Sequence, residues 1–202
     1  MKPVVHVVDD DEAIRESLAL LLESNGQPAR AYADAAVFLA GLDPDAPGCV
    51  VADVRMAPMT GLELQRELRQ QGVALPIIII TGHGDVAMAV QALKDGAADF
   101  IEKPFDEDVF LASVRSALDQ GERTFRERRV AADLQGRVAT MTPREREVMD
   151  LVVQGMANKA VAAELAISVR TVEIHRARVM EKMAAKSLSD LVRAALRLEE
   201  AG

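Results

Sequence analysis

Five side chains that could act together chemically each follow a short run of apolar residues in this sequence. Asp9 and Asp10 follow the first run, Asp53 ends a second, Thr81 ends a third, and Lys103 follows a fourth. Carboxylate oxygens are the ligands that Mg²⁺ prefers, and a carboxylate can serve as a nucleophile toward a phosphoryl group. Adjacent carboxylates raise one another's pKa unless a positive charge lies between them. The residue types therefore predict an acidic, cation-binding site, provided that the fold brings the five residues together.

The apolar runs have the length and composition of strands in a parallel sheet. They are short and rich in β-branched residues, which is typical of strands that are covered on both faces. The predicted strands comprise residues 4–8, 28–33, 48–54, 75–81 and 98–104. Amphipathic stretches alternate with them at residues 11–24, 34–42, 61–72, 85–97 and 106–120. We therefore predict a flavodoxin-like, doubly wound α/β domain with a five-stranded parallel sheet, in which ligands bind at the carboxyl ends of the strands.

The composition indicates two modules with different partners. Residues 1–122 contain nine Lys and Arg against 21 Asp and Glu, a net charge of −12, whereas residues 123–202 contain 15 against 11, a net +4. The apolar runs are far shorter than the roughly 20 residues of a membrane-spanning helix, and acidic residues follow the N-terminus too soon for a signal peptide. We expect a cytoplasmic protein with no membrane partner, in which the single Cys49 is a core residue.

Four motifs of the first module occur in the order of a known family. They are VVDDDE, VVADVRMAPMTG, IIIITGHGD and DFIEKPF, and they resemble the receiver domain of two-component response regulators over essentially the whole of residues 2–120. The resemblance implies that Asp53 accepts a phosphoryl group from the phosphohistidine of a sensor histidine kinase. It further implies Mg²⁺ ligation by Asp10, Asp53 and the Arg55 backbone carbonyl, with Asp9 acting through water and Lys103 pairing with the acceptor carboxylate.

The same resemblance gives Thr81 and Phe100 the role of a conformational switch. A phosphoryl group on Asp53 adds roughly two negative charges, which would draw in the Thr81 hydroxyl and leave space for the Phe100 ring to turn inward.

Four loop positions of this module carry separate expectations. Met56-Ala57-Pro58-Met59 stands where the family commonly has Met-Pro-Gly-Met, and the shifted proline predicts a changed loop and an altered rate of phosphoryl transfer or hydrolysis. The Lys103–Pro104 bond is expected to be cis, as is common in the family. His83 has no second His or Cys near it, so we do not expect it to bind a metal. Asp11 is expected as an acid of a solvated loop or of a helix N-terminus, where its charge is favourable toward the helix dipole.

Residues 121–138 continue a helical and highly charged pattern, which predicts a linker between the modules. Gly121 and Gly136 are expected to interrupt the helix. The apolar positions are too irregular for a convincing heptad repeat, so a helix that pairs across a dimer and a solvated spacer both remain open.

Residues 139–202 predict a small all-α domain. Thr142, Pro143 and Glu145 form a helix start with an N-cap, a proline at the first helical position and a capping box, and Gly155 is placed to end that helix. Further short helices are predicted at residues 158–166, 169–183 and 187–198. Two of these flank a tight turn, so we predict a four-helix helix-turn-helix domain.

The helix predicted at residues 169–183 has an apolar stripe and a basic outer face, as expected of a helix that enters a DNA major groove. Residues 139–198 are similar to the LuxR-class DNA-binding domain of the NarL/FixJ response regulators, and the pairing with the receiver motifs indicates the FixJ-like branch. By this resemblance Glu173, Ile174 and Ala177 contact base edges, Thr171 also belongs to the interface, and the phosphate contacts come from Lys159, Arg170, Arg176, Arg178 and Lys182. His175 is expected to be structural and to hydrogen-bond within the domain.

These features together predict a transcription regulator that is phosphorylated on Asp53, dimerises and binds promoter DNA, with RNA polymerase as a further possible partner. We do not expect an enzyme, because a phosphatase that used Asp53 would generally need an acid two positions later, where Arg55 stands. A regulator that binds DNA whether or not it is phosphorylated remains an alternative.

Overall fold

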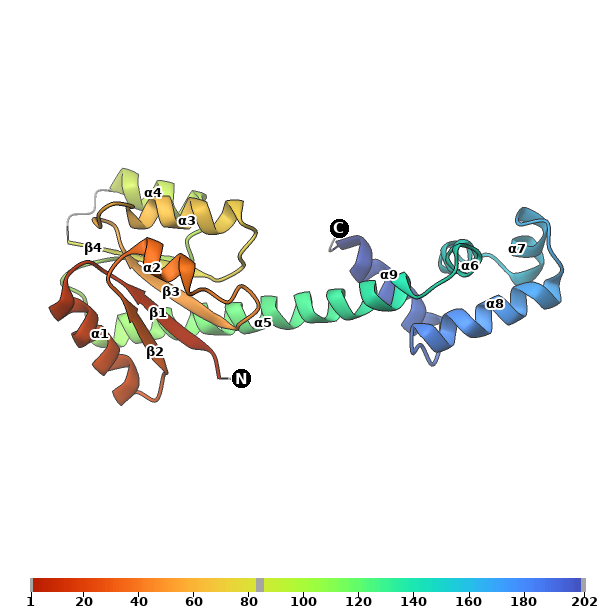
Figure 1. Cartoon of the computed structure of the whole chain (residues 1–202), viewed down its shortest axis with the longest axis horizontal. Helices are drawn as coiled ribbons and strands as arrows, with labels where there is room; N and C mark the ends of the chain where they lie inside the picture. Colours follow the sequence, from red (N-terminus) through yellow and green to blue (C-terminus); the bar gives the residue numbers. More distant parts are fainter. Residues whose placement is uncertain (1, 83–85, 201–202) are drawn as a thin grey trace. The chain divides into compact units, whose positions relative to one another are not determined.

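The computed structural model describes residues 2–82 and 86–200, and the chain divides into two compact units, Met1–Arg126 and Glu127–Gly202 (Figure 1). In the first unit the strands are β1 Val4–Val8, β2 Ala29–Tyr32, β3 Gly48–Asp53, β4 Ile77–Thr81 and β5 Asp99–Glu102. The helices are α1 Glu12–Ser24, α2 Ala35–Ala40, α3 Gly61–Gln70, α4 Val86–Lys94 and α5 Glu107–Ala139, of which α5 continues into the second unit.

The five strands form one parallel sheet in the order β2-β1-β3-β4-β5, which confirms the predicted doubly wound fold. The strand order reverses between β1 and β3, and in open α/β sheets this topological switch point is where ligands bind. The register aligns Val8 with Ala52 and Asp53 with Ile80, so the carboxyl ends of β1, β3 and β4 lie at one edge.

Alternate residues of the strands supply two cores, one on each face of the sheet. Helices α1 and α5 cover one face, and α2, α3 and α4 cover the other, as Figure 1 shows. The β4 side chains illustrate the alternation, since Ile78 and Ile80 pack toward α1 and α5 while Ile77 and Ile79 pack toward the opposite helices. Cys49 is fully buried in the first of these cores, which confirms its prediction as a core residue.

The predicted interruptions of α5 are wrong, because the helix is continuous from Glu107 to Ala139 through both glycines. Gly121 has a different role: a Cβ on it would lie 2.3 Å from the carbonyl oxygen of Gly48, so the missing side chain lets α5 approach the start of β3. Gly136 is exposed and has no neighbouring atoms within 4 Å of a Cβ position. A glycine in a helix costs only about 1 kcal/mol relative to alanine, which the packing of a long helix can offset.

The second unit contains α6 Pro143–Val153, α7 Asn158–Glu164, α8 Val169–Lys182 and α9 Leu188–Glu200, which confirms the predicted helical domain. The capping box at Thr142 and Glu145 is present. Gly155 follows the C-cap residue Gln154 of α6 and has a φ of +89°, as its predicted position at the helix end requires. Leu134 in the last turns of α5 is buried in the core of this unit, together with Met141, so the end of α5 belongs to the helical domain. The predicted bounds of the linker, residues 121–138, stay predictions.

None of the helices in the described part of the chain has the length and apolarity needed to cross a bilayer.

Candidate functional site

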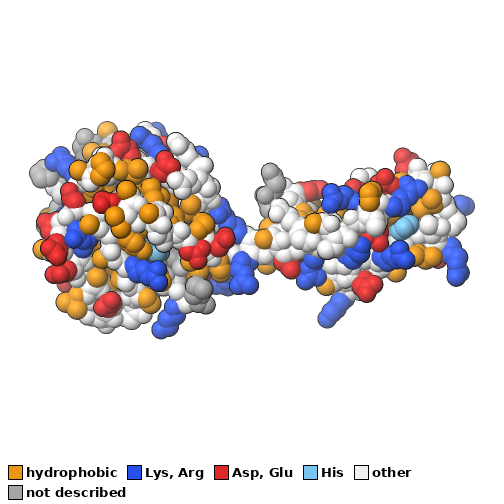
Figure 2. Space-filling view, in the orientation of Figure 1, with side chains coloured by type: hydrophobic (Ala, Val, Ile, Leu, Met, Phe, Trp, Pro, Cys, Tyr) orange, Lys and Arg blue, Asp and Glu red, His pale blue; other side chains and the backbone are white. Residues whose placement is uncertain are grey.

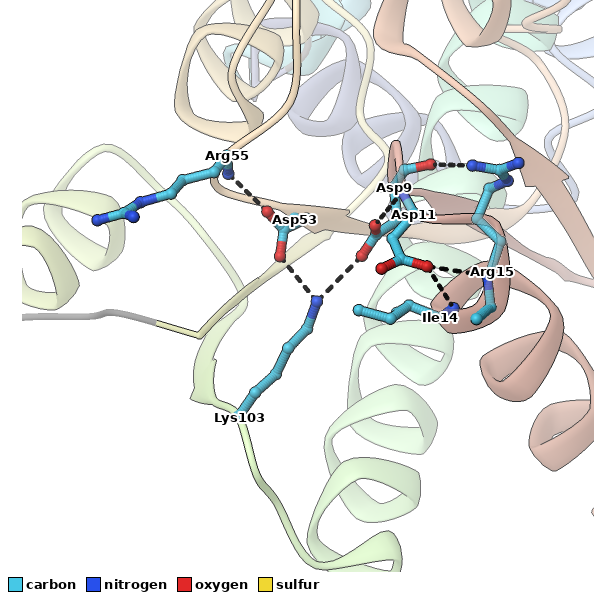
Figure 3. A network of polar contacts seen from close by, with 8 residues as sticks. Asp9, Asp11, Ile14, Arg15, Asp53, Arg55 and Lys103 are labelled. Carbon is cyan, nitrogen blue, oxygen red and sulfur yellow. Dashed lines mark hydrogen bonds and ion pairs between the residues drawn. The ribbon is translucent and has the colours of Figure 1, made fainter.

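Two buried carboxylates and an ammonium group meet at the switch point of the sheet (Figure 3). The Lys103 Nζ donates to Asp53 Oδ1 at 2.8 Å and to Asp9 Oδ2 at 3.0 Å. Asp53 ends β3, Asp9 follows β1, and Lys103 follows β5, so three separate strand ends place these groups together. The structure thus brings together three of the five residues that the sequence singles out, with the cation between the two acids.

The charges of this cluster are held with little access to water. Asp9 is 1% exposed and Asp53 is 8% exposed. Burial raises the pKa of Asp9 above its ordinary value, and the Asp11 N–H and the Lys103 ammonium only partly oppose this effect. Burial alone would lower the pKa of Lys103, but its hydrogen bonds to Asp53 and Asp9 outweigh burial and raise it. Lys103 therefore remains an ammonium group beside Asp53.

Backbone N–H groups fix the carboxylates from the other side. The Arg55 N–H donates to Asp53 Oδ2 at 2.6 Å, and the Asp11 N–H donates to Asp9 Oδ1 at 2.9 Å. Arg15 of α1 donates from its guanidinium to the Asp9 carbonyl oxygen at 2.8 Å, which ties the loop after β1 to the helix. This role of Arg15 is not predicted from the sequence, since nothing in a local pattern links an arginine on a helix to a carbonyl six residues earlier.

Asp10 and Asp11 differ from Asp9 in their surroundings. Asp10 is exposed, at the same loop but outside the hydrogen-bonded cluster of Asp9, Asp53 and Lys103. Asp11 is the N-cap of α1 and accepts from the N–H groups of Ala13 and Ile14 at 2.9 and 3.3 Å, which confirms its predicted place at a helix N-terminus.

The segment after Asp53 is built to approach the strand closely. A Cβ on Gly61, the first residue of α3, would lie 2.3 Å from the Asp53 carbonyl oxygen. Thr60 and Glu63 form a capping box that fixes the start of α3 at this point. This capping box is absent from our sequence predictions, although the Thr-x-x-Glu spacing is a recognisable signal for it. The intervening Ala57–Pro58 bond is cis, and the Lys103–Pro104 bond is cis as predicted.

The predicted switch residues lie on two adjacent strands: Thr81 on β4, which pairs with β3, and Phe100 on β5, beyond β4. Thr81 is fully buried at the end of β4, and Phe100 of β5 is half-buried and packs against the core under α2, α3 and α4. His83, which we did not expect to bind a metal, lies outside the described residues.

The donor set at the switch point suits a hard cation, because the carboxylates and the Arg55 carbonyl supply only oxygen. Among residues 2–82 and 86–200, however, no group of three His, Cys, Asp or Glu side chains lies together as a ready-made metal site. The described geometry instead places the Lys103 ammonium between Asp9 and Asp53. The oxygen atoms of Asp9, Asp53 and the Arg55 carbonyl fit the chemistry of Mg²⁺. Asp10, the other carboxylate of the loop after β1 that we predict as a ligand, is exposed to solvent.

The second unit exposes most of its predicted DNA contacts on α7 and α8. Among these residues the exposed cations are Lys159, Arg170 and Arg178. The three residues predicted to contact base edges, Glu173, Ile174 and Ala177 of α8, are exposed as well, and we refer to α8 as the predicted recognition helix. Ile174 is 48% exposed although it is a large apolar side chain. Figure 2 shows Lys and Arg side chains protruding from this unit between acidic ones. An apolar side chain among exposed cations suits a contact with base edges and phosphates.

Four other residues of this surface have partners or surroundings within the unit. Thr171 bonds the α8 N-cap Ser168 through its N–H and hydroxyl, at 3.1 and 2.8 Å. Arg176 donates to Asn158 of α7 at 2.9 Å, and Lys182 donates to two acceptors considered below. The Nδ1 atom of His175 is buried without a hydrogen-bond partner among the described residues, so the bond that we predicted for this ring is wrong at that nitrogen.

Comparisons with known proteins agree with both units. Residues 5–115 match the response regulator receiver domain, and residues 139–195 match the bacterial regulatory proteins of the luxR family. The chain is 50% identical to the transcriptional regulatory protein FixJ of Azorhizobium caulinodans, over 95% of this chain and 91% of that protein. It is 41% identical to the response regulator protein TodT of Pseudomonas putida, over 98% of this chain and 87% of that protein.

Two solved structures cover nearly the whole chain. That of the response regulator StyR has a TM-score of 0.86 at 38% identity and covers 98% of this chain and all of that one. That of full-length FixJ from B. japonicum has a TM-score of 0.58 at 47% identity, with 99% of this chain and 98% of that one covered. The resemblance that the motifs predict is therefore confirmed along the whole chain.

Proposed function

Since the chain belongs to the FixJ-like response regulators, which are phosphorylation-dependent transcription regulators with a receiver and a LuxR-type DNA-binding domain, we propose that Asp53 is its phospho-acceptor. The observation that carries the proposal is the contact between Asp53 Oδ1 and the Lys103 ammonium at 2.8 Å, at the switch point of the sheet. This ammonium offsets negative charge where a phosphoryl group would arrive.

The transfer runs from a phosphohistidine of a sensor histidine kinase to the Asp53 carboxylate. A carboxylate oxygen forms the new P–O bond, the P–N bond to the imidazole breaks, and the released imidazole nitrogen keeps the electron pair. Lys103 supports the phosphoryl oxygens, and the Arg55 N–H keeps the second carboxylate oxygen in place. Asp9, Asp10, Asp53 and the Arg55 carbonyl are the residues that would hold Mg²⁺, which supplies further charge neutralisation when bound.

The response to phosphorylation starts at Thr81 and Phe100. Thr81 is buried at the end of β4, directly beside β3, so its hydroxyl is near enough in the sheet to follow a new acceptor on Asp53. Phe100 lies on β5, on the other side of β4 from β3. Its side chain is half-buried, so the ring can turn toward the core or toward solvent. We propose that this pair transmits the change to α4 and β5.

The output is a dimer that binds two half-sites of promoter DNA in the cytoplasm, with RNA polymerase as the partner through which transcription changes. A single helix-turn-helix domain makes few contacts, and a second copy raises the affinity through effective concentration. The exposed cations and Ile174 on α7 and α8 support this use of the second unit.

The test is intact-mass spectrometry with light scattering on the full chain, in the presence of Mg²⁺ and acetyl phosphate. The matched control is Asp53→Asn, which keeps the side-chain shape but removes the nucleophilic charge. We expect one added phosphoryl mass and a shift toward dimer for the wild type only. Equal modification of both proteins refutes Asp53 as acceptor, and equal dimerisation of both favours a regulator that binds DNA without phosphorylation.

The same samples test the proposal that the protein is not a phosphatase. With Arg55 two positions after Asp53, no carboxylic acid stands there to protonate a leaving alcohol. We therefore expect no sustained release of inorganic phosphate from glycerol 3-phosphate, an alkyl phosphate whose leaving oxygen needs a proton. Sustained turnover by the wild type that Asp53→Asn abolishes would contradict this proposal.

A further inference from the structure

Lys182, the last residue of the recognition helix α8, directs its ammonium group into its own domain. The Nζ donates to the carbonyl oxygen of Thr140 at 2.8 Å and to Glu145 Oε2 at 2.6 Å. The side chain is only 29% exposed. A phosphate contact would need this ammonium to face solvent, and both of its protein bonds point elsewhere.

Glu145 is an unusual partner because its carboxylate is almost completely buried, with a side-chain exposure of 2%. The same Oε2 accepts the N–H of Thr142 at 2.9 Å, and the Glu145 N–H donates to the Thr142 hydroxyl at 3.3 Å. The Lys182 ammonium and then the Thr142 N–H lower the pKa of Glu145 to about 2. Removing one partner of a buried pair leaves an uncompensated charge, so the two residues depend on each other.

Thr140 lies directly after the end of α5, where terminal carbonyl groups lack helical partners. Its N–H and hydroxyl both donate to the Arg137 carbonyl, at 3.1 and 2.6 Å. Arg146 of α6 donates to the Val138 carbonyl at 3.2 Å, and Lys182 of α8 takes the Thr140 carbonyl. Two cations from two helices of the DNA-binding domain thus bind the end of α5.

The apolar core reinforces the same junction. Leu134 of α5 is 8% exposed and shares a core with Met141, and with Val179 and Met183 on either side of Lys182 along the chain. Apolar side chains therefore pack the end of α5 against the last turn of α8, in addition to the hydrogen bonds that Lys182 makes to Thr140 and Glu145.

We propose that Lys182 is a positioning residue that fixes the recognition helix to the end of α5 and to the start of α6, and that it does not contact DNA phosphates. The inference goes beyond the proposed function and does not depend on Asp53. By this contact the last turns of α5 and the recognition helix become parts of one rigid body, so a movement of this end of α5 also moves α8.

Arg178, one turn earlier on α8, provides the contrast. It is exposed, and its charge has no ion-pair partner among the described residues. Each phosphate that a cation neutralises adds about 0.9 to the slope of log Kobs against log salt concentration. A phosphate contact and a positioning contact are therefore distinguishable by their effects on this slope.

The experiment measures binding of the full chain, treated with Mg²⁺ and acetyl phosphate, to two DNA duplexes over a range of salt concentrations. One duplex is selected by the wild-type chain from a random-sequence pool, and the other is poly(dI–dC). For Lys182→Met we expect an unchanged salt slope and a ratio of selected to non-specific affinity that falls by about tenfold, the effect of one mismatched base pair. For the control Arg178→Gln we expect a slope smaller by about 0.9 per chain, with both duplexes weakened alike.

Glu145→Gln keeps the proposal testable if Lys182→Met does not fold. The glutamine side chain still accepts the Thr142 N–H but removes the negative charge beside Lys182, so the selectivity should fall here too, again without a change of slope. The proposal is overturned if Lys182→Met lowers the slope as Arg178→Gln does. It is equally overturned if Glu145→Gln folds, as far-UV circular dichroism reports, and keeps the wild-type selectivity.

Discussion

Replacing Gly121 by alanine tests the contact that joins α5 to the sheet. The new Cβ would lie 2.3 Å from the Gly48 carbonyl oxygen and 3.3 Å from the Pro76 ring. Neither group can swing aside as a flexible side chain does, so the helix or the strand must shift. Overpacking of this kind costs about 1–3 kcal/mol, whereas alanine gains about 1 kcal/mol over glycine inside a helix. With a clash of about 2 kcal/mol, the net destabilisation of the receiver unit is about 1 kcal/mol.

Gly136 offers a matched control on the same helix. It is exposed, and a Cβ there meets nothing within 4 Å. Gly136→Ala keeps the gain in helix propensity of about 1 kcal/mol and has no clash. Because Gly136 lies in the second unit, this variant shows whether a glycine-to-alanine change elsewhere on α5 alters the unfolding of the receiver unit.

The single tyrosine makes the assay specific for one unit. The protein has no tryptophan, and Tyr32 lies in β2 with its hydroxyl 3.1 Å from His6 Nδ1. Tyrosine fluorescence in a urea titration therefore follows the receiver unit. We expect a lower midpoint for Gly121→Ala and no change for Gly136→Ala. A wild-type midpoint for Gly121→Ala would refute the argument that α5 needs a glycine at this approach.

Three further perturbations follow from buried residues. Burial lowers the pKa of His6 to about 4, while an unfolded histidine titrates near 6.5, so the stability that neutral His6 contributes is present above pH 6.5 and is lost as the pH falls toward 4. At pH 5 we expect the free energy of unfolding, followed by tyrosine fluorescence, to be lower by about 2 kcal/mol. The variant His6→Phe should lack this part of the pH dependence. Burial raises the pKa of Cys49 to about 12, so a thiol reagent at pH 8 should modify it only in urea, and rapid modification of the folded chain would contradict this. Leu134→Ala should destabilise the DNA-binding unit by about 2–5 kcal/mol in far-UV circular dichroism, whereas the exposed Val130→Ala should change it by less than about 0.5; equal effects would mean that Leu134 is only a linker residue.

The sequence predicts the sheet and its site well because both depend on local patterns. The β-branched runs specify strands, and residues that end parallel strands must share one edge, so Asp9, Asp53 and Lys103 could be placed together without any knowledge of contacts. What separates Asp9 from its neighbour Asp10 is burial, which depends on how the loop after β1 packs. A local pattern carries no information about this packing.

The two glycines of α5 show how a local rule fails. Both have the same intrinsic cost in a helix, and the sequence gives no reason to treat them differently. In the structure one faces the Gly48 carbonyl and the other faces solvent. The same residue type is therefore required by packing at position 121 and is replaceable at position 136, and only the tertiary contact decides.

Glu145 combines the predictable and the unpredictable in one side chain. Its bond to Thr142 spans three residues and follows from the capping-box spacing, whereas its bond to Lys182 spans 37 residues and depends on how α6 packs against α8. A count of charges treats Lys182 as one more cation available to DNA. Since Glu145 already neutralises it inside the domain, the net charge of +4 on residues 123–202 is not distributed as the count suggests. The positive charge that can meet a phosphate backbone comes from exposed side chains such as Arg178, and Lys182 does not add to it.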